Sequence, residues 1–492
     1  MGLIGQQTIK GTFYSYLGVV IGFINLAILS PVIFTAGEIG VTQVMMAMAT
    51  IVAQLGGLGF SNVTNRLFPW FRDRESGHNG FLSLGLLITA AGFLVTAIVL
   101  IFWLPDFEEA NREKSELLSD YAYYIPVLVG MIMFFTLLDN FCKVLFNAVI
   151  GTFLREVVLR VINLGLILMF HFGIIGFSGY VSGFVLSQAI PAVIIIIYLA
   201  GRGEFRLTGF ASFIDRKLIR EIITLSGYGV IAGLSGIAIT NIDKYMVNSY
   251  LGLSEVGIYS IAVYFATLIL IPARVMGKIS VPVVAEAWKR NDKQSINIIY
   301  RKSSINQYLI GLLVFLGIVC NMHNIFKILP SEYMQGQYVI ILFGLTNLLN
   351  VSSGISQYIL STSELYRYTA FMMLLLIVLV LATNILLIPV YGITGAAIAS
   401  LLSMFVFNGV MVGILYAKFR LWPYTSGHVV LTFGGGVIYL VTSVIPVMGL
   451  ISDLVIRSLS ITVLFGLLVL LSGVSTEVTS FAGYLKGLLK KR

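Results

Sequence analysis

Long apolar runs, separated by short polar or Gly/Pro-containing segments, occupy most of this chain. A helix needs about 20 apolar residues to cross roughly 30 Å of hydrocarbon, because lipid cannot satisfy exposed backbone groups. Only the short segment His171 to Gly173 interrupts the apolar residues between the run at 152–172 and the run at 175–200. The pattern predicts fourteen transmembrane helices, at about 11–34, 39–62, 80–104, 121–147, 152–172, 175–200, 222–250, 256–282, 303–325, 335–360, 366–388, 391–418, 427–449 and 453–475.

The basic residues outside or at the ends of these runs are distributed unevenly. If the N-terminus is cytoplasmic, the inside segments hold 22 Lys and Arg residues, among them Arg155, and the outside segments hold 4. Cytoplasmic loops carry an excess of Lys and Arg, and this bias sets orientation. We therefore expect an even number of spans, with both termini on the cytoplasmic side of the inner (plasma) membrane. The outside residues are Arg112, Lys114, Lys327 and Arg457.

Composition agrees with this pattern. Of the 492 residues, 58% are hydrophobic and only 11% are charged, with a mean hydropathy of +0.96, so we predict an all-α integral membrane protein. The net charge of +9 lies in short loops, where it is a topology signal and does not indicate nucleic-acid binding. The first run follows only Lys10 and has no small-residue cleavage site, which favours a retained span.

The sequence offers no motif for catalysis or cofactor binding. Cys142 and Cys320 lie inside apolar runs, and the four histidines have no metal-ligand spacing. No Gly-rich loop ending in Lys-Ser or Lys-Thr is present for nucleotide binding. We expect a protein that is not an enzyme, with no catalytic residue, no metal and no cofactor.

An internal repeat is visible in two echoes. Glu38-Ile39-Gly40 and Ala49-Thr50 recur 217 positions later as Glu255-Val256-Gly257 and Ala266-Thr267. A second echo, between 173–176 and 392–395, has a displacement of 219. Nearly equal displacements indicate one duplication, and a repeat of six helices gives two halves that enter the membrane in the same direction.

The repeat and the loops predict four parts. They are an N-terminal lobe of six helices at 1–200, a cytoplasmic linker at 201–221, a C-terminal lobe of six helices at 222–420, and two further helices with a basic cytoplasmic tail at 421–492.

Charged residues inside membrane spans are costly and are candidates for function. Arg274 and Lys278 are four residues apart, so they share a helix face and repel each other unless an anion lies nearby. One interpretation is that both side chains extend to the inner headgroups. The other is that they bind a diphosphate in a central cavity, for which Arg suits a bidentate contact.

Two other cations have acidic partners at the same spacing. Asp139 with Lys143, and Glu156 with Arg160, can form structural ion pairs within one helix. Lys143 and Arg160 are nevertheless retained as candidate substrate-binding residues, because Arg160 lies deep enough in its span to face a cavity.

Two further features concern movement. Asp243 and Lys244 are adjacent, hence about 100° apart on a helix, and are candidates for gating or substrate release. Pro272 precedes Arg274 by two residues and is a candidate hinge, although a static bend is the alternative.

Several segments resemble a known family. Asp243, the turn Gly252–Leu253, the run Glu255–Ala262 with Pro282, and the stretch Asn384–Ser400 are similar to Wzx-type polysaccharide flippases. These belong to the multidrug/oligosaccharidyl-lipid/polysaccharide exporter superfamily, and Gly57-x-Gly59 with Arg66 fits the same pattern.

The resemblance implies a fold, an activity and partners. The fold would have two MATE-like lobes around a V-shaped cavity. The activity would be translocation of an undecaprenyl-diphosphate-linked oligosaccharide, a repeat unit of O-antigen, capsule or exopolysaccharide, from the cytoplasmic to the outer leaflet by alternating access. Membrane lipids, a polysaccharide polymerase and a chain-length regulator would be partners.

Four alternatives stay open at this stage. A cation-coupled multidrug exporter of the same superfamily often uses an acidic residue inside a helix of the N-terminal lobe, and the first span of this chain has none, only Asn25. A related peptidoglycan lipid flippase is a second alternative. A membrane glycosyltransferase or polymerase would need acid–base or metal-binding groups in a sizeable outer loop, and the acidic segment 105–120 is short for that role. A scaffold protein would not need charges inside its spans.

Overall fold

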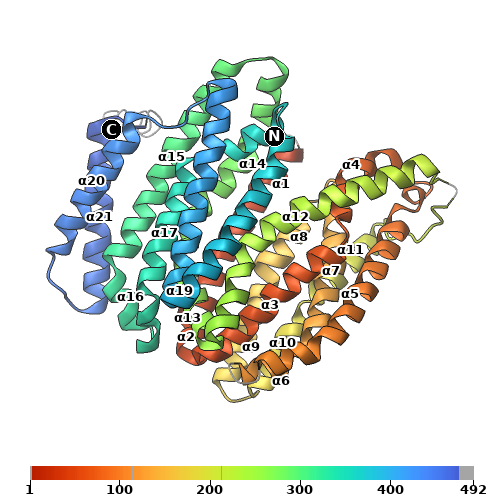
Figure 1. The fold of residues 1–492 in the computed structure, drawn as a ribbon, viewed down its shortest axis with the longest axis horizontal. Helices are drawn as coiled ribbons and strands as arrows, with labels where there is room; N and C mark the ends of the chain where they lie inside the picture. The colour runs from red at the N-terminus through yellow and green to blue at the C-terminus, as the bar shows by residue number, and fades with distance from the viewer. Residues whose placement is uncertain (1–2, 112–114, 212, 476–492) are drawn as a thin grey trace, which may run out of the picture. The chain divides into compact units, whose positions relative to one another are not determined.

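The structure, a computed structural model, describes residues 3–111, 115–211 and 213–475 (Figure 1). These residues form helices and turns, with no strand among them, so the predicted all-α fold class is confirmed. Packing divides the chain into two compact units, Met1–Ser260 and Ile261–Arg492, which we call the N-terminal unit and the C-terminal unit.

The N-terminal unit contains helices α1 to α12 and the first half of α13. Two of its helical segments, η1 (Phe23–Leu29) and η4 (Leu154–Val158), are π-helical. The α-helices are α1 (Leu3–Gly22), α2 (Ser30–Ile33), α3 (Ala36–Gly56), α4 (Phe60–Phe71), α5 (Phe81–Asn111), α6 (Glu116–Tyr121), α7 (Ile125–Val144), α8 (Val149–Phe153), α9 (Leu159–His171), α10 (Phe177–Ser187), α11 (Ile190–Gly201), α12 (Arg216–Leu251) and α13 (Leu253–Thr267).

The C-terminal unit begins within α13 and contains the remaining helices. These are α14 (Ile271–Lys289), α15 (Lys293–Cys320), α16 (Met322–Ile328), α17 (Gln337–Ser352), α18 (Ser356–Thr362), α19 (Arg367–Phe419), α20 (Ser426–Ser443) and α21 (Leu450–Ser472).

Ten helices in the described part of the chain are long and apolar enough to cross a membrane, or eleven if the bent pair Ser331–Ser352 and Ser356–Thr362 is one span. One of the ten, α19, has 53 residues and would be about 80 Å long if straight, more than two bilayer cores. Its backbone leaves the helical region at Gly392 (φ 60°, ψ −142°), and Thr383 Oγ1 lies 3.1 Å from Ser403 Oγ. It is therefore a hairpin of two passes, as the separate runs 366–388 and 391–418 predict. The total of fourteen stays a prediction.

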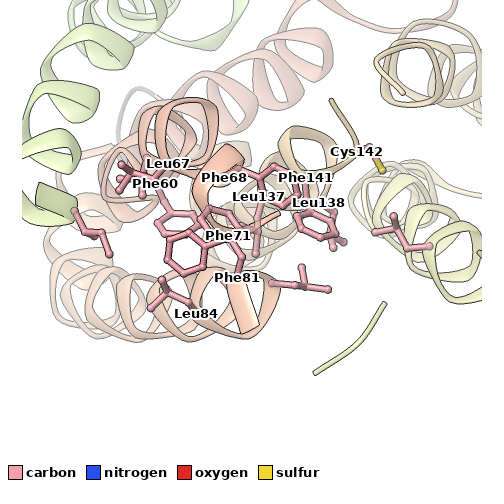
Figure 2. Close-up of a cluster of buried hydrophobic side chains, with 14 of the residues drawn as sticks. Phe60, Leu67, Phe68, Phe71, Phe81, Leu84, Leu137, Leu138, Phe141 and Cys142 are labelled. Carbon is pink, nitrogen blue, oxygen red and sulfur yellow. The ribbon is translucent and has the colours of Figure 1, made fainter. Parts of the chain in front are cut away.

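An aromatic cluster forms the core where α4, α5 and α7 meet (Figure 2). The ring of Phe68 contacts Phe81 and Phe141 edge to face, with centroids 5.3 and 5.6 Å apart, and Phe71 meets Phe81 at 5.0 Å. Such pairs stabilise a core beyond the area they bury. The cluster holds α4 and α7 in fixed positions, and both helices carry residues of the site described below.

The repeat seen in the sequence has a reciprocal contact in the structure. A Cβ atom on Gly40 of α3 would lie 2.1 Å from the carbonyl oxygen of Leu253, and one on Gly257 of α13 would lie 2.0 Å from the carbonyl oxygen of Ala36. Gly257 lies 217 positions after Gly40, and Leu253 lies 217 positions after Ala36, so the two contacts are equivalent in the repeat. The starts of α3 and α13 thus pack against each other by the same atoms in each direction, as expected of a two-fold repeat.

The packing boundary differs from the predicted lobe boundary. Helix α12 packs along α3 and α4, so it belongs to the N-terminal unit by contact. This grouping describes contacts and not evolutionary repeats, and the lobes 1–200 and 222–420 with their linker stay a prediction.

Candidate functional site

A polar pocket of about 160 Å³ lies inside the N-terminal unit, between α3, α4, α5, α7 and the π-helical segment η4. We call it the N-terminal polar pocket. Amide, hydroxyl and guanidinium groups supply its polar lining, from Thr50, Gln54, Ser61, Thr64, Thr89, Thr136, Asn140 and Arg155.

A glycine turn between α3 and α4 shapes one wall. Gly59 has φ +64°, in the left-handed region, and a Cβ there would lie 2.2 Å from the carbonyl oxygen of Ser226 on α12. Only glycine meets both demands without strain. The turn places Gln54, before the break, and Ser61, after it, on the same pocket, which gives the Gly57-x-Gly59 motif a structural role.

Helix α7 supplies the opposite wall. Asn140 donates its amide to the Ser61 hydroxyl at 2.7 Å, which ties α7 to α4. The Thr136 hydroxyl, one turn earlier, donates to the carbonyl of Ile132 at 2.7 Å. A hydroxyl that donates to its own helix still has lone pairs to accept a hydrogen bond. The wall can therefore accept hydrogen bonds from a polyhydroxylated ligand.

Arg155 is the charged residue of this lining and its side chain is exposed. Within the described part of the chain it has no acidic partner at ion-pair distance, and its neighbour Glu156 pairs instead with Arg160 at 2.7 Å. It belongs to η4, and single π-helical turns often mark functional sites. A guanidinium group without a carboxylate partner is suited to bind an oxyanion such as phosphate with two hydrogen bonds.

The predicted cations Lys143 and Arg160 lie elsewhere and have partners. Lys143 Nζ is 2.6 Å from Asp139 on α7, although its side chain remains 42% exposed. Arg160 pairs with Glu156 and also donates to the carbonyl of Gly18, which joins α9 to α1. The structure thus gives both residues the contacts of the structural interpretation, and their substrate-binding role stays a prediction.

The gating candidates both contact neighbouring helices. Asp243 is buried and accepts a hydrogen bond of 2.9 Å from the Tyr259 hydroxyl on α13, and Lys244 Nζ donates to Gln43 Oε1 on α3 at 2.8 Å. These bonds connect α12 to the two helices of the reciprocal Gly40–Leu253 contact. Their role in gating is untested.

The side chains of Arg274, Lys278 and Pro272 lie outside the described residues, so their predicted roles remain predictions. The backbone around them shows that a 3-10 turn at Leu268–Leu270 separates α13 from α14. The chain therefore changes helical geometry directly before the predicted hinge.

Sequence reasoning missed Arg155 as a site residue, because the charge count treated it as a topology signal near a helix end. The sequence does contain an indication of the pocket itself, in the polar residues Thr136 and Asn140. They lie four apart in an otherwise apolar span and therefore share one helix face.

Comparisons with known proteins give relatives of two kinds. A membrane protein of Methanocaldococcus jannaschii, MJ1068, of uncharacterized function, is 24% identical over 349 residues, which cover 66% of this chain and 66% of that protein. The probable low-salt glycan biosynthesis flippase Agl15 of Haloferax volcanii is 26% identical over 188 residues, 38% of this chain and 40% of that protein. The chain thus spans about two thirds and two fifths of these curated relatives.

Solved structures share the fold. The lipid II flippase MurJ in an inward closed conformation superposes with a TM-score of 0.76, at 11% identity, over 94% of this chain and 98% of that chain. An inward-facing multidrug resistance MATE transporter of the MOP superfamily gives a TM-score of 0.59 at 15% identity, over 83% and 94%. Residues 8–288, more than half of the sequence, match the family of polysaccharide biosynthesis proteins. The chain is therefore a multi-pass membrane protein that belongs to the polysaccharide biosynthesis protein family.

Proposed function

We propose that this protein is a flippase that carries a lipid-linked glycan across the membrane. The observation that carries the proposal is the N-terminal polar pocket, in which Arg155 lies beside amide and hydroxyl groups in a chain of this family. Burying polar headgroup atoms in lipid without hydrogen bonds costs several kcal/mol per group, roughly 4–8 for transfer to an alkane. A polar pocket removes that cost for the headgroup, and the hydrocarbon tail can stay in lipid.

The chemistry of the pocket suits the diphosphate of such a headgroup. Arg155 can bind phosphate oxygens with two hydrogen bonds, and Asn140, Ser61 and Gln54 can donate hydrogen bonds to the remaining phosphate oxygens. In the predicted orientation, Asn140 and Arg155 lie near the cytoplasmic ends of their spans. The headgroup would therefore be loaded from the cytoplasmic side.

The relatives support the activity and leave the substrate open. Agl15 is described as a glycan biosynthesis flippase and MurJ as a lipid II flippase. An undecaprenyl-diphosphate-linked repeat unit of O-antigen, capsule or exopolysaccharide is the specific substrate we propose. The inner (plasma) membrane location, the cytoplasmic termini, and a polymerase and chain-length regulator as partners belong to the same proposal.

The reciprocal contact between α3 and α13 is the candidate point of opening. It is made of backbone atoms around Gly40 and Gly257, so it is tight and contains few side chains that would have to rearrange. Asp243 and Lys244, bonded to these two helices, would change partners when the contact opens. These contacts support the gating role that we propose for them.

The experiment is a transbilayer assay with purified protein in liposomes. A fluorescent polyprenyl-diphosphate-linked oligosaccharide is placed in both leaflets, and a membrane-impermeant quencher is added outside. We expect the accessible fraction to rise from about half towards completion only when the protein is present. The proposal fails if the fraction stays at the protein-free value, and efflux of a cationic dye by the same liposomes would instead favour a multidrug exporter.

A further inference from the structure

A second polar pocket, of about 170 Å³, lies inside the C-terminal unit. We call it the C-terminal polar pocket. Its lining comes from α15, α17, the turn after α17, α18 and α19. The polar and aromatic lining residues used below are Gln307, Asn350, Ser353, Gln357, Tyr358, Phe407 and Asn408.

The two pockets occupy equivalent places in the repeat. Ala53 lines the first and Leu270 the second, and these positions differ by the repeat displacement of 217. Thr136 and Asn140 line the first pocket, and Ser353 and Gln357, each 217 positions later, line the second. The duplication has therefore produced one polar pocket in each unit.

The C-terminal polar pocket contains buried hydrogen-bonding atoms without partners. The side chain of Gln307 is in a residue only 1% exposed, and neither its Nε2 nor its Oε1 has a hydrogen-bond partner among the described residues. Asn408 is 5% exposed; its Oδ1 accepts from the Ser353 hydroxyl at 3.1 Å, but its Nδ2 is likewise without a described partner. Buried polar groups are rarely left in this state, so these two amides point to a ligand.

The chemistry of the pocket identifies the class of ligand. Its described lining side chains carry no charge, in contrast to Arg155 in the N-terminal polar pocket. An amide offers a donor and an acceptor together, which matches sugar hydroxyls, since each of these also donates and accepts. Tyr358 and Phe407 add aromatic surface against which the apolar face of a sugar ring can pack.

We propose that the C-terminal polar pocket binds an uncharged sugar residue of the glycan headgroup through Gln307 and Asn408. This inference rests on the proposed flippase function. Each pocket would then bind a different chemical part of the glycan headgroup. The N-terminal polar pocket would bind the phosphate, and the C-terminal polar pocket would bind a neutral sugar.

The test compares two probes and matched variants. The probes are a polyprenyl diphosphate without sugar and the same lipid carrying one N-acetylhexosamine, and the dissociation constant of each is measured for purified full-length protein. Gln307→Met removes the amide at similar size, and Asn408→Leu is the second variant. Gln294→Met is the control, because Gln294 lies on the same helix α15 but is exposed.

We expect Gln307→Met and Asn408→Leu each to weaken binding of the glycosylated probe about 10-fold and to leave binding of the sugar-free probe unchanged. Gln307→Met should not lower the melting temperature, because replacing an unpartnered buried amide by an apolar group is close to neutral. Asn408→Leu should lower it only slightly, because the Ser353 hydroxyl that loses Asn408 Oδ1 can still donate to the Asn350 carbonyl at 2.7 Å. The inference is overturned if both probes bind the variants as they bind the wild type, which indicates a water-filled pocket, or if both probes weaken equally. If the wild type fails to flip the glycosylated lipid, the flippase proposal itself fails, and that result is separate from the binding comparison.

Discussion

A buried ion pair in the C-terminal unit allows a quantitative prediction. Asp453 is fully buried and the side chain of Arg457, one turn later on α21, is 4% exposed. Arg457 Nη2 lies 3.0 Å from Asp453 Oδ1, and the guanidinium also donates to the carbonyls of Thr442 and Ile445 at the end of α20. His323 on α16 contacts the same carboxylate at 2.7 Å. The pair therefore joins α16, α20 and α21, the last two of which lie side by side (Figure 1).

We predict that Arg457→Met destabilises the protein by about 3–5 kcal/mol, since it leaves the Asp453 charge buried without its main partner. The entropy of unfolding is about 2.1 cal/mol/K per residue, or about 0.5 kcal/mol/K for a cooperative unit as long as Ile261–Arg492. The melting temperature should therefore fall by about 6–10 °C.

The measurement is thermal unfolding of purified protein in detergent, with a double-mutant cycle. The double variant Asp453→Leu with Arg457→Met should recover most of the loss, because an apolar pair can replace a buried ion pair at little cost. Arg290→Met is the matched control: Arg290 pairs with Glu286 at the same spacing, but both side chains are more than 60% exposed. Exposed pairs contribute less than about 1 kcal/mol. An Arg457→Met shift no larger than that of the control would refute the reasoning.

Two further predictions concern helix packing and helix capping. Gly40→Ala should destabilise the protein by about 1–3 kcal/mol, because the new methyl group would meet the backbone of Leu253, whereas Gly165→Ala on α9, with open space around it, should be neutral or stabilising by up to about 1 kcal/mol. Thermal unfolding of the two variants tests this, and equal shifts would contradict the close contact. At the start of α15, hydrogen bonds from Ser295 lower the pKa of the Asp292 carboxyl. The folded pKa is depressed, so the cap stabilises α15 above the ordinary carboxyl pKa of about 3.9 and is lost as pH falls through the lower folded value. The protection factors against hydrogen exchange in the first turn of α15 should fall over that range in the wild type but not in Asp292→Asn; wild-type protection factors that do not change with pH would contradict the prediction.

The fold class follows from the sequence because it depends on averages over long segments. Apolar runs are long enough to define helices, and the repeat at Gly40 and Gly257 is visible because backbone packing there requires glycine in both copies. The hairpin within α19 is likewise predictable, since Gly392 interrupts an apolar run too long for one crossing.

The site is less predictable because burial of a polar residue depends on which helices pack around it. Arg457 is counted from sequence as an outside charge, yet it is 3% exposed and bonded to Asp453. Arg155 is counted as an inside charge, yet it lines a pocket. Gln307 is visible in the sequence as a polar residue inside the predicted span 303–325, but its lack of partners is not, because that arises from the packing of α15 against other helices.

The central claim, that the N-terminal polar pocket carries the diphosphate of a lipid-linked glycan, is tested by the initial flipping rate in liposomes at limiting substrate. One lost hydrogen-bonded contact to a charged group is worth about 1.5–3 kcal/mol. We therefore predict that Arg155→Ala lowers the rate roughly 10- to 150-fold, with partial recovery in Arg155→Lys. Arg206→Ala removes an exposed arginine from the segment after α11 and should flip at the wild-type rate. Equal rates for Arg155→Ala and Arg206→Ala would contradict the account.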